Sequence, residues 1–138
     1  MKKLIFLSFL VCLAVLQSHG QNRKNGPFKK GDVWVGTYEC AGEKYEMKLN
    51  ILEAQKGIIR SSFVFRNNTG SYEVIGQIKN NEFTFNSVLW EKNPTNYTTL
   101  GMHGFYLEGP DRLVGSTISK LTFSEGDECT GFYLTRQK

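Results

Sequence analysis

The sequence predicts an all-β protein, an eight-stranded antiparallel up-and-down β-barrel closed by one disulfide. Short stretches of alternating apolar and polar residues recur along the chain, separated by Gly- and Asn-rich turns roughly 10–15 residues apart. No stretch has the apolar period of a helix. Cys40 and Cys129 lie in the first and last of these stretches. Because a closed meander makes its first and last strands neighbours, these two cysteines can meet.

The chain begins with a segment that is typical of a secretory signal peptide. Two lysines precede an apolar run from Leu4 to Leu16, and the small residues Ser18 and Gly20 follow it. A membrane-spanning helix needs about 18 or more apolar residues, and this run is shorter. We therefore expect residues 1–20 to be a signal peptide, the protein to be secreted and extracellular, and the chain to have no membrane span.

The expected mature chain is short and nearly balanced in charge. Removing 20 residues from 138 leaves 118, which suits one domain. The 17 basic residues become 15 when Lys2 and Lys3 leave, against 13 acidic residues, so the net charge falls from +4 to about +2. This charge does not favour nucleic acid as a partner. Residues 21–31 are basic and have no apolar period, which predicts a disordered basic N-terminal tail before a barrel domain at 32–138.

Each of the first five expected strands alternates with a period of two, as half-buried strands do. Turn sequences separate them at 56–57, 67–70 and 79–81, where Asn and Gly supply the positive φ angles of tight hairpins. The first strand is expected at Val33–Cys40. We expect the interior-facing residues to be, strand by strand, Trp34, Gly36, Tyr38 and Cys40; Tyr45, Met47, Leu49 and Ile51; Ile59, Ser61, Phe63 and Phe65; Tyr72, Val74, Gly76 and Ile78; and Phe83, Phe85, Ser87 and Leu89.

The last three expected strands follow a longer loop that begins at Glu91. Gly101 and Gly104 would bend the sixth strand or allow a close approach of its neighbour. The remaining elements are strands from about Tyr97 to Leu107, from Leu113 to Ile118 and from Cys129 to Arg136, a turn at Glu108–Asp111 and an acidic loop from Thr122 to Glu128.

The cysteines predict one disulfide and no metal site. Cys12 would leave with the signal peptide, so Cys40 and Cys129 remain and allow one pairing. The loop that this bond closes has 129 − 40 = 89 residues, which the chain-entropy estimate values at about 4–5 kcal/mol. His103 is the remaining soft metal ligand of the mature chain, and no metal-binding spacing is present. We expect no metal and no cofactor.

A secreted barrel with Trp34 in its first strand and Arg136 in its last resembles the lipocalin and avidin group of calycin-type barrels. In lipocalins a Gly-x-Trp at the start of the first strand is covered by a C-terminal Arg or Lys. The resemblance implies that Trp34 and Arg136 plug one end of the barrel. The sequence departs from the pattern, because Gly31 stands three residues before Trp34 rather than two. No ligand is therefore carried over from these families.

No motif indicates catalysis. His103 is the single mature histidine, and a histidine on a strand face or barrel rim is the simpler interpretation. The chain also lacks a phosphate-binding loop and any nucleic-acid motif. We expect no catalytic residue.

Asn67 and Asn96 begin the two N-glycosylation sequons of the chain that a proline does not block.

Two functions fit this sequence, and both are non-enzymatic. The first is a binding protein that carries or sequesters a small apolar ligand in its barrel, with pocket candidates Trp34, Tyr38, Tyr72, Phe85 and Tyr106. The second is an extracellular structural or interaction protein, a component of a matrix or secretion or an inhibitor. Its barrel would be filled, and its loops at Glu91–Thr98 and Lys120–Glu128 would contact a partner. An internal cavity would distinguish the two, and the sequence indicates no oligomeric state.

Overall fold

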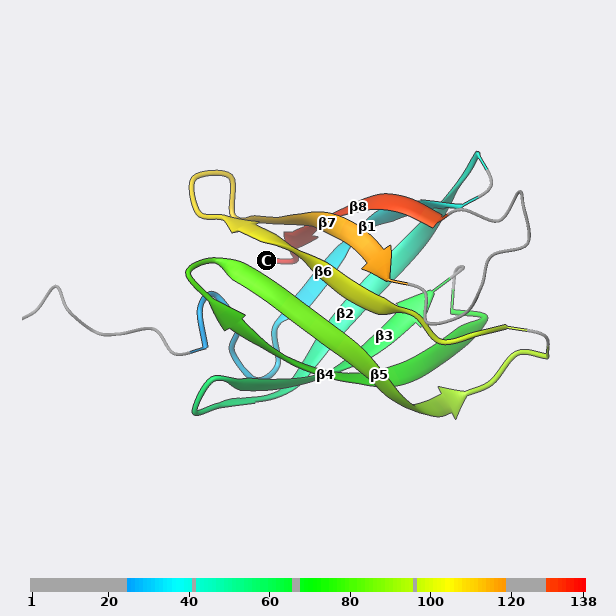
Figure 1. Cartoon of the computed structure of the whole chain (residues 1–138), viewed down its shortest axis with the longest axis horizontal. Coiled ribbons are helices and arrows are strands. Elements are labelled where there is room, and N and C mark those ends of the chain that lie inside the picture. The colour runs from blue at the N-terminus through cyan, green and yellow to red at the C-terminus, as the bar shows by residue number, and fades with distance from the viewer. Residues whose placement is uncertain (1–24, 41, 66–67, 96, 119–128) are drawn as a thin grey trace, which may run out of the picture.

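The computed structural model describes residues 25–40, 42–65, 68–95, 97–118 and 129–138. Within them eight antiparallel strands form a closed barrel in which each strand pairs with the next along the chain (Figure 1). The predicted all-β barrel is confirmed. The strands are β1 (Val33–Cys40), β2 (Glu43–Gln55), β3 (Ile58–Phe65), β4 (Gly70–Lys79), β5 (Glu82–Lys92), β6 (Gly101–Leu107), β7 (Arg112–Ile118) and β8 (Cys129–Arg136).

The barrel closes where β1 pairs with β8. Cys40 lies opposite Cys129 in this pairing, and the two form the predicted disulfide. Gly36 lies opposite Leu134, and a Cβ at Gly36 would overlap the backbone carbonyl of Tyr133. A glycine at this position therefore lets the two strands approach closely enough to complete the ladder.

The two ends of the barrel are built differently. The β2–β3, β4–β5 and β6–β7 connections are tight turns, with positive φ angles at Lys56, Asn80, Asn81 and Asp111. They lie at the same end as the start of β1 and the C-terminus, on the left of Figure 1. We call this the hairpin end. β1, β3, β5 and β7 end at the opposite end of the barrel, and β2, β4, β6 and β8 begin there. We call it the loop end.

Residues 25–31 pack against the hairpin end, so the prediction of a disordered tail over 21–31 is wrong for this part of it. The Asn25 side chain donates to the Ala54 carbonyl at 2.8 Å and accepts from the Gly57 amide at 2.7 Å. Phe28 is 2% exposed. Residues 21–24 and the expected signal peptide at 1–20 lie outside the described residues. The Phe28 ring contacts the rings of Trp34, Phe83 and Phe85, with centroids 5.7–6.3 Å apart.

The alternation predicted for the strands holds along β2, β3 and β4 but fails near the end of β5. Val74 on β4 pairs with Ser87, and Tyr72 pairs with Trp90, so three steps along β5 match two along β4. The extra residue is a β-bulge, which reverses the facing of the residues after it. Leu89 is therefore 53% exposed, and Trp90 packs against the core. The expected inward position of Leu89 is wrong for this reason.

The sixth strand is shorter than the sequence predicts. β6 begins at Gly101 rather than near Tyr97, because its pairing with β5 starts at Met102 opposite Phe85. Gly104 faces Gly115 on β7, and a Cβ on either glycine would overlap the opposite backbone. The close approach predicted at Gly104 is confirmed.

We predict that the disulfide is a major source of stability. The Cys40→Ser, Cys129→Ser and double variants should each lose about 4–5 kcal/mol of unfolding free energy, measured by urea denaturation. The double variant should lose no more than the single ones, because one bond is removed in all three. Unchanged stability in any of them would contradict the role assigned to this bond.

We also predict that the segment before β1 belongs to the folded core. Phe28→Ala should cost about 3–5 kcal/mol, because it empties a fully buried aromatic site. The matched control is Phe105→Ala, since the Phe105 side chain is 47% exposed on the outer surface and should change stability little. Equal losses in the two variants, measured in the same urea titration, would exclude a core role for Phe28.

Candidate functional site

Arg136 fastens the hairpin end. Its guanidinium carbon lies 4.7 Å from the centroid of the Trp34 ring, so the contact predicted between these residues is confirmed. Its Nη1 donates to Asp32 at 3.1 Å, its Nη2 donates to the Pro27 carbonyl at 2.9 Å, and its Nε lies 3.2 Å from an Asp111 oxygen. One side chain thus joins the N-terminal segment, β1 and the β6–β7 turn. Together with Phe28 it closes this end of the barrel.

The aromatic residues of the interior lie in two groups. The hairpin-end aromatic cluster comprises Phe28, Trp34, Phe83, Phe85, Tyr106 and Phe132. The loop-end aromatic cluster comprises Tyr38, Tyr45, Phe63, Phe65, Tyr72, Trp90 and Tyr97, with ring centroids 5.0–6.4 Å apart.

The predicted pocket residues are divided between these two clusters. Trp34, Phe85 and Tyr106 belong to the closed hairpin end, whereas Tyr38 and Tyr72 belong to the loop-end aromatic cluster. The five residues therefore do not line one pocket. Trp34 and Phe85 are core residues, and Tyr106 is half-buried against the core. The two residues at the loop end remain candidates for a binding site.

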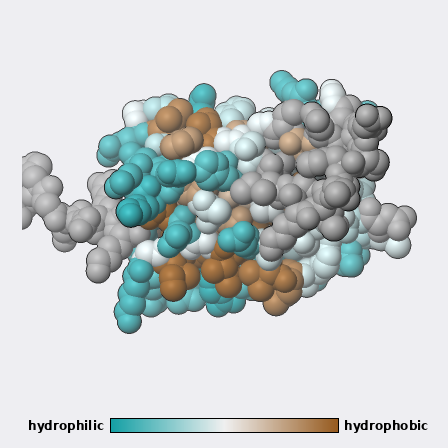
Figure 2. Space-filling view, in the orientation of Figure 1, coloured by the Kyte–Doolittle hydropathy of each residue, from teal (hydrophilic) through white to brown (hydrophobic). Residues whose placement is uncertain are grey.

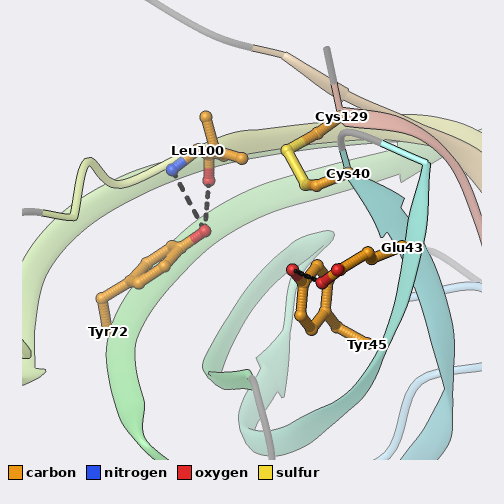
Figure 3. Close-up of a disulfide and its surroundings, with 6 residues drawn as sticks. All are labelled: Cys40, Glu43, Tyr45, Tyr72, Leu100 and Cys129. Carbon is orange, nitrogen blue, oxygen red and sulfur yellow. Dashed lines mark hydrogen bonds between the residues drawn. A yellow bond between two sulfur atoms is a disulfide. The ribbon is translucent and has the colours of Figure 1, made fainter. Parts of the chain in front are cut away.

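Tyr72 holds the β5–β6 connection over the loop-end aromatic cluster. Its side chain is 2% exposed, and its hydroxyl both accepts from the Leu100 amide at 3.1 Å and donates to the Leu100 carbonyl at 2.9 Å (Figure 3). The Tyr97 ring lies 5.7 Å from the Phe65 ring. Residues 97–100 thus lie against the cluster. Burial raises the pKa of Tyr72 well above its ordinary value, because the phenolate would be poorly solvated.

The loop-end aromatic cluster becomes more exposed towards solvent. Tyr45 and Trp90 are half-buried, and Tyr97 is 38% exposed. The Tyr45 hydroxyl donates to Glu43 at 2.6 Å, and in Figure 3 this pair lies near the disulfide of Cys40. The cluster therefore offers aromatic faces with a phenol and a carboxylate at its rim. This set of groups suits a flat apolar molecule that carries a polar substituent.

The pairing of β5 with β6 is incomplete towards the loop end. β6 pairs with β5 from Glu82 to Phe85, while β5 continues beside β4 as far as Lys92. The chain before β6 turns to Tyr72 instead of continuing the ladder. In the described part of the chain, residues 86–92 consequently have no backbone partner on the β6 side. We call this stretch the free edge of β5.

A hollow of about 370 Å³ lies on the outer surface of the barrel, over β1, β2 and β3. Its lining residues are Val35, Gly36, Thr37, Glu46, Met47, Lys48, Val64 and Asn68. None of the predicted pocket residues lines it. This hollow is therefore separate from the interior site that the sequence suggests.

His103 and Arg60 form ion pairs on the outer surface of the barrel. His103 Nε2 lies 2.7 Å from a Glu82 oxygen, with the two side chains 38% and 54% exposed. Arg60 pairs with Glu73 at 3.0 Å and with Glu53 at 3.4 Å. Among the residues that the structure describes, no three His, Cys, Asp or Glu side chains are grouped closely enough to hold a metal. Those residues also contain no helix with the length and hydropathy that crossing a bilayer requires.

Two sets of predicted residues lie outside the described ranges. They are the sequon asparagines Asn67 and Asn96 and the loop at Lys120–Glu128.

Three site residues were missed from the sequence, namely Phe28, Trp90 and Tyr97. Phe28 is the single large apolar residue in a polar stretch, and this was the signal available for it. The inward turn of Trp90 depends on the bulge, which leaves no local mark in the sequence.

No protein-family model matches this chain, and no curated protein is similar enough to count as a match. The function is therefore argued from the geometry of the barrel.

We predict that tyrosine burial makes stability depend on alkaline pH. Because the pKa of Tyr72 is raised in the folded state, its contribution is complete below about pH 10 and is lost as pH rises through the folded-state pKa. For each proton that the folded state retains and the unfolded state has lost, the unfolding free energy falls by at most about 1.4 kcal/mol per pH unit. In urea titrations, the unfolding free energy of Tyr72→Phe should fall less steeply between pH 10 and 11.5 than that of the parent protein. Tyr106, whose pKa is also raised, supplies part of the remaining slope.

The control for this experiment is Phe63→Leu, which weakens the same cluster without removing an ionisable group. It should lower the stability at every pH and leave the alkaline slope unchanged. If Tyr72→Phe shows the same slope as the parent protein, the buried state of the Tyr72 hydroxyl is not what causes the alkaline loss.

Proposed function

We propose that this protein is a secreted, non-enzymatic barrel that binds a small apolar or aromatic molecule in its loop-end aromatic cluster. The observation that carries the proposal is the gradation of this cluster from fully buried Tyr72 to the half-buried Trp90 and the partly exposed Tyr97. The aromatic rings thus continue from the interior to the rim of the barrel, where a ligand can reach them. Small-molecule sites are typically lined by such rings with a few polar groups among them.

The construction of the two ends supports binding at the loop end. Phe28 and Arg136 close the hairpin end, and the tight turns there leave no long connection that could move. At the loop end, the β5–β6 connection crosses the cluster and is held by the two hydrogen bonds between Tyr72 and Leu100. A ligand would reach the aromatic faces when this connection moves aside.

The chemistry of the cluster suggests the class of ligand. Each ring contact adds about 0.5–1.5 kcal/mol beyond simple burial, which favours a flat molecule that presents its face or edge to several rings. The Tyr45 hydroxyl and Glu43 at the rim would fix a polar substituent of the ligand. Secretion rests on the predicted signal peptide, and the disulfide between Cys40 and Cys129 supports an oxidising compartment.

A second candidate function is an extracellular interaction protein whose barrel is filled. The close contacts within the loop-end aromatic cluster favour it, since the Phe63 and Tyr72 rings lie 5.0 Å apart and already occupy each other's faces. In that case the rings only stabilise the barrel, and contacts with a partner come from the loops and outer surface. The two functions differ in whether the cluster admits a small molecule.

The two tryptophans allow a direct test, because Trp90 lies in the loop-end aromatic cluster and Trp34 in the hairpin-end aromatic cluster. Trp34→Phe leaves Trp90 as the single tryptophan, and Trp90→Phe leaves Trp34, so excitation at a wavelength that tyrosine does not absorb reports each in turn. Titration with 1-bromonaphthalene, a flat apolar quencher that acts on contact, should quench Trp90 saturably and leave Trp34 unchanged. Equal quenching of both, or none that saturates, would contradict binding at the loop end.

The affinity should depend on the ring at the rim of the cluster. Tyr97→Ala should weaken binding of the same probe roughly 2–10-fold, which corresponds to the loss of one aromatic contact. The control is Phe105→Ala, whose exposed ring lies on the outer surface and should not affect the probe. Native mass spectrometry of the purified protein would show in addition whether a ligand is retained from the producing cell.

A further inference from the structure

Within the described residues, the free edge of β5 is the longest stretch of strand that lacks a strand partner on one side. The other seven strands are paired with both neighbours along most of their lengths. Within 86–92, four residues pair with β4, namely Asn86, Ser87, Trp90 and Lys92. No described residue bonds to the backbone of this stretch on the other side. Unpaired N–H and C=O groups in a row are a template for another strand.

The same stretch exposes apolar side chains. Val88 and Leu89 are consecutive, and 51% and 53% of each is exposed. Both lie at the bulge, which removes Leu89 from the interior. Figure 2 shows hydrophobic surface over β4 and β5 on the lower side of the view. A backbone edge and an apolar pair at one place are the two features by which added strands are recognised.

We propose that the free edge of β5 is a self-association site, where a second copy of this chain adds its own β5 in antiparallel orientation. The two copies would be related by a two-fold axis at Leu89, so that the contact is isologous and closes on itself. The pairing would extend the sheet of each barrel across the interface.

The sequence of the edge is complementary to itself in this register. Leu89 meets Leu89 of the second copy, and Val88 meets the backbone of Trp90, so the apolar residues lie at the centre. Glu91 then faces Ser87, and Lys92 faces Asn86, so no like charges meet at either end. A partner of different sequence would have to supply this arrangement, whereas a second copy already has it.

The association should be weak. An edge of this length buries little surface compared with stable interfaces, and a bulge limits the regular pairing of an edge. We therefore expect a monomer–dimer equilibrium with a dissociation constant on the order of 100 µM.

The test is the oligomeric state of the purified full chain, measured by sedimentation equilibrium up to millimolar concentration. Leu89→Lys should raise the dissociation constant by at least about tenfold, because it brings two like charges together on the two-fold axis. The matched control is Ile58→Lys. Ile58 is 57% exposed, but it lies on β3, which is paired on both sides, so dimerisation should remain as in the parent protein.

A second measurement places the axis. Leu89→Cys should form a disulfide-linked dimer under mild oxidation, because the two residues at position 89 face each other, while Ile58→Cys should not. A parent protein that stays monomeric at millimolar concentration would overturn the proposal. Equal effects of the two lysine variants, or equal crosslinking of the two cysteine variants, would also overturn it. A co-purifying foreign protein released by Leu89→Lys would assign the edge to another partner instead.

Discussion

The rest of the structure depends on the junction between β1 and β8, where the barrel closes. Two cross-strand pairs hold the ends of this junction, and they are of different kinds. Cys40 and Cys129 are joined covalently towards the loop end, and Trp34 lies under the guanidinium of Arg136 at the hairpin end. Between them Gly36 lets the two backbones approach. Because this junction is held at both of its ends, the barrel stays closed even where strand pairing is incomplete, as it is between β5 and β6.

The hairpin end shows how few residues are needed to close a small barrel. Phe28 fills its centre, and Arg136 ties the segment that carries Phe28 to β1 and to the β6–β7 turn. The charges and the ring act together, since the ion pair with Asp32 holds the chain in the position that buries Phe28. This end has the packing of a core, and the proposed ligand site is therefore placed at the other end.

The loop end is organised by one hydroxyl group. Tyr72 satisfies both the amide and the carbonyl of Leu100 from inside the barrel, which draws the β5–β6 connection over the aromatic cluster. The same contact takes the chain away from β5 and leaves the edge at 86–92. The cover of the proposed ligand site and the proposed self-association site thus have a common origin.

The sequence by itself determined features that depend on neighbouring residues along the chain, and features that follow from the number of cysteines. A period of two is a property of each strand, and it indicated the inward faces of β2, β3 and β4 correctly. The two cysteines outside the expected signal peptide allowed one pairing. The contact between Trp34 and Arg136 followed from their places in adjacent strands and from a family resemblance. The predicted pocket set contained true interior residues, but the sequence could not show that they belong to opposite ends of the barrel.

Only the tertiary structure decided the burial of Phe28, the inward turn of Trp90 and the early separation of β5 from β6. Phe28 has no apolar neighbours in the chain, and its burial depends on rings that β1 and β5 supply. The bulge arises from the pairing of β4 with β5, and no periodicity within β5 records it. Where strand pairing is regular, the sequence alone indicates which face of the sheet a residue lies on. Where pairing with another strand shifts the register, as at the bulge of β5, contacts in space decide it, and the sequence does not show them.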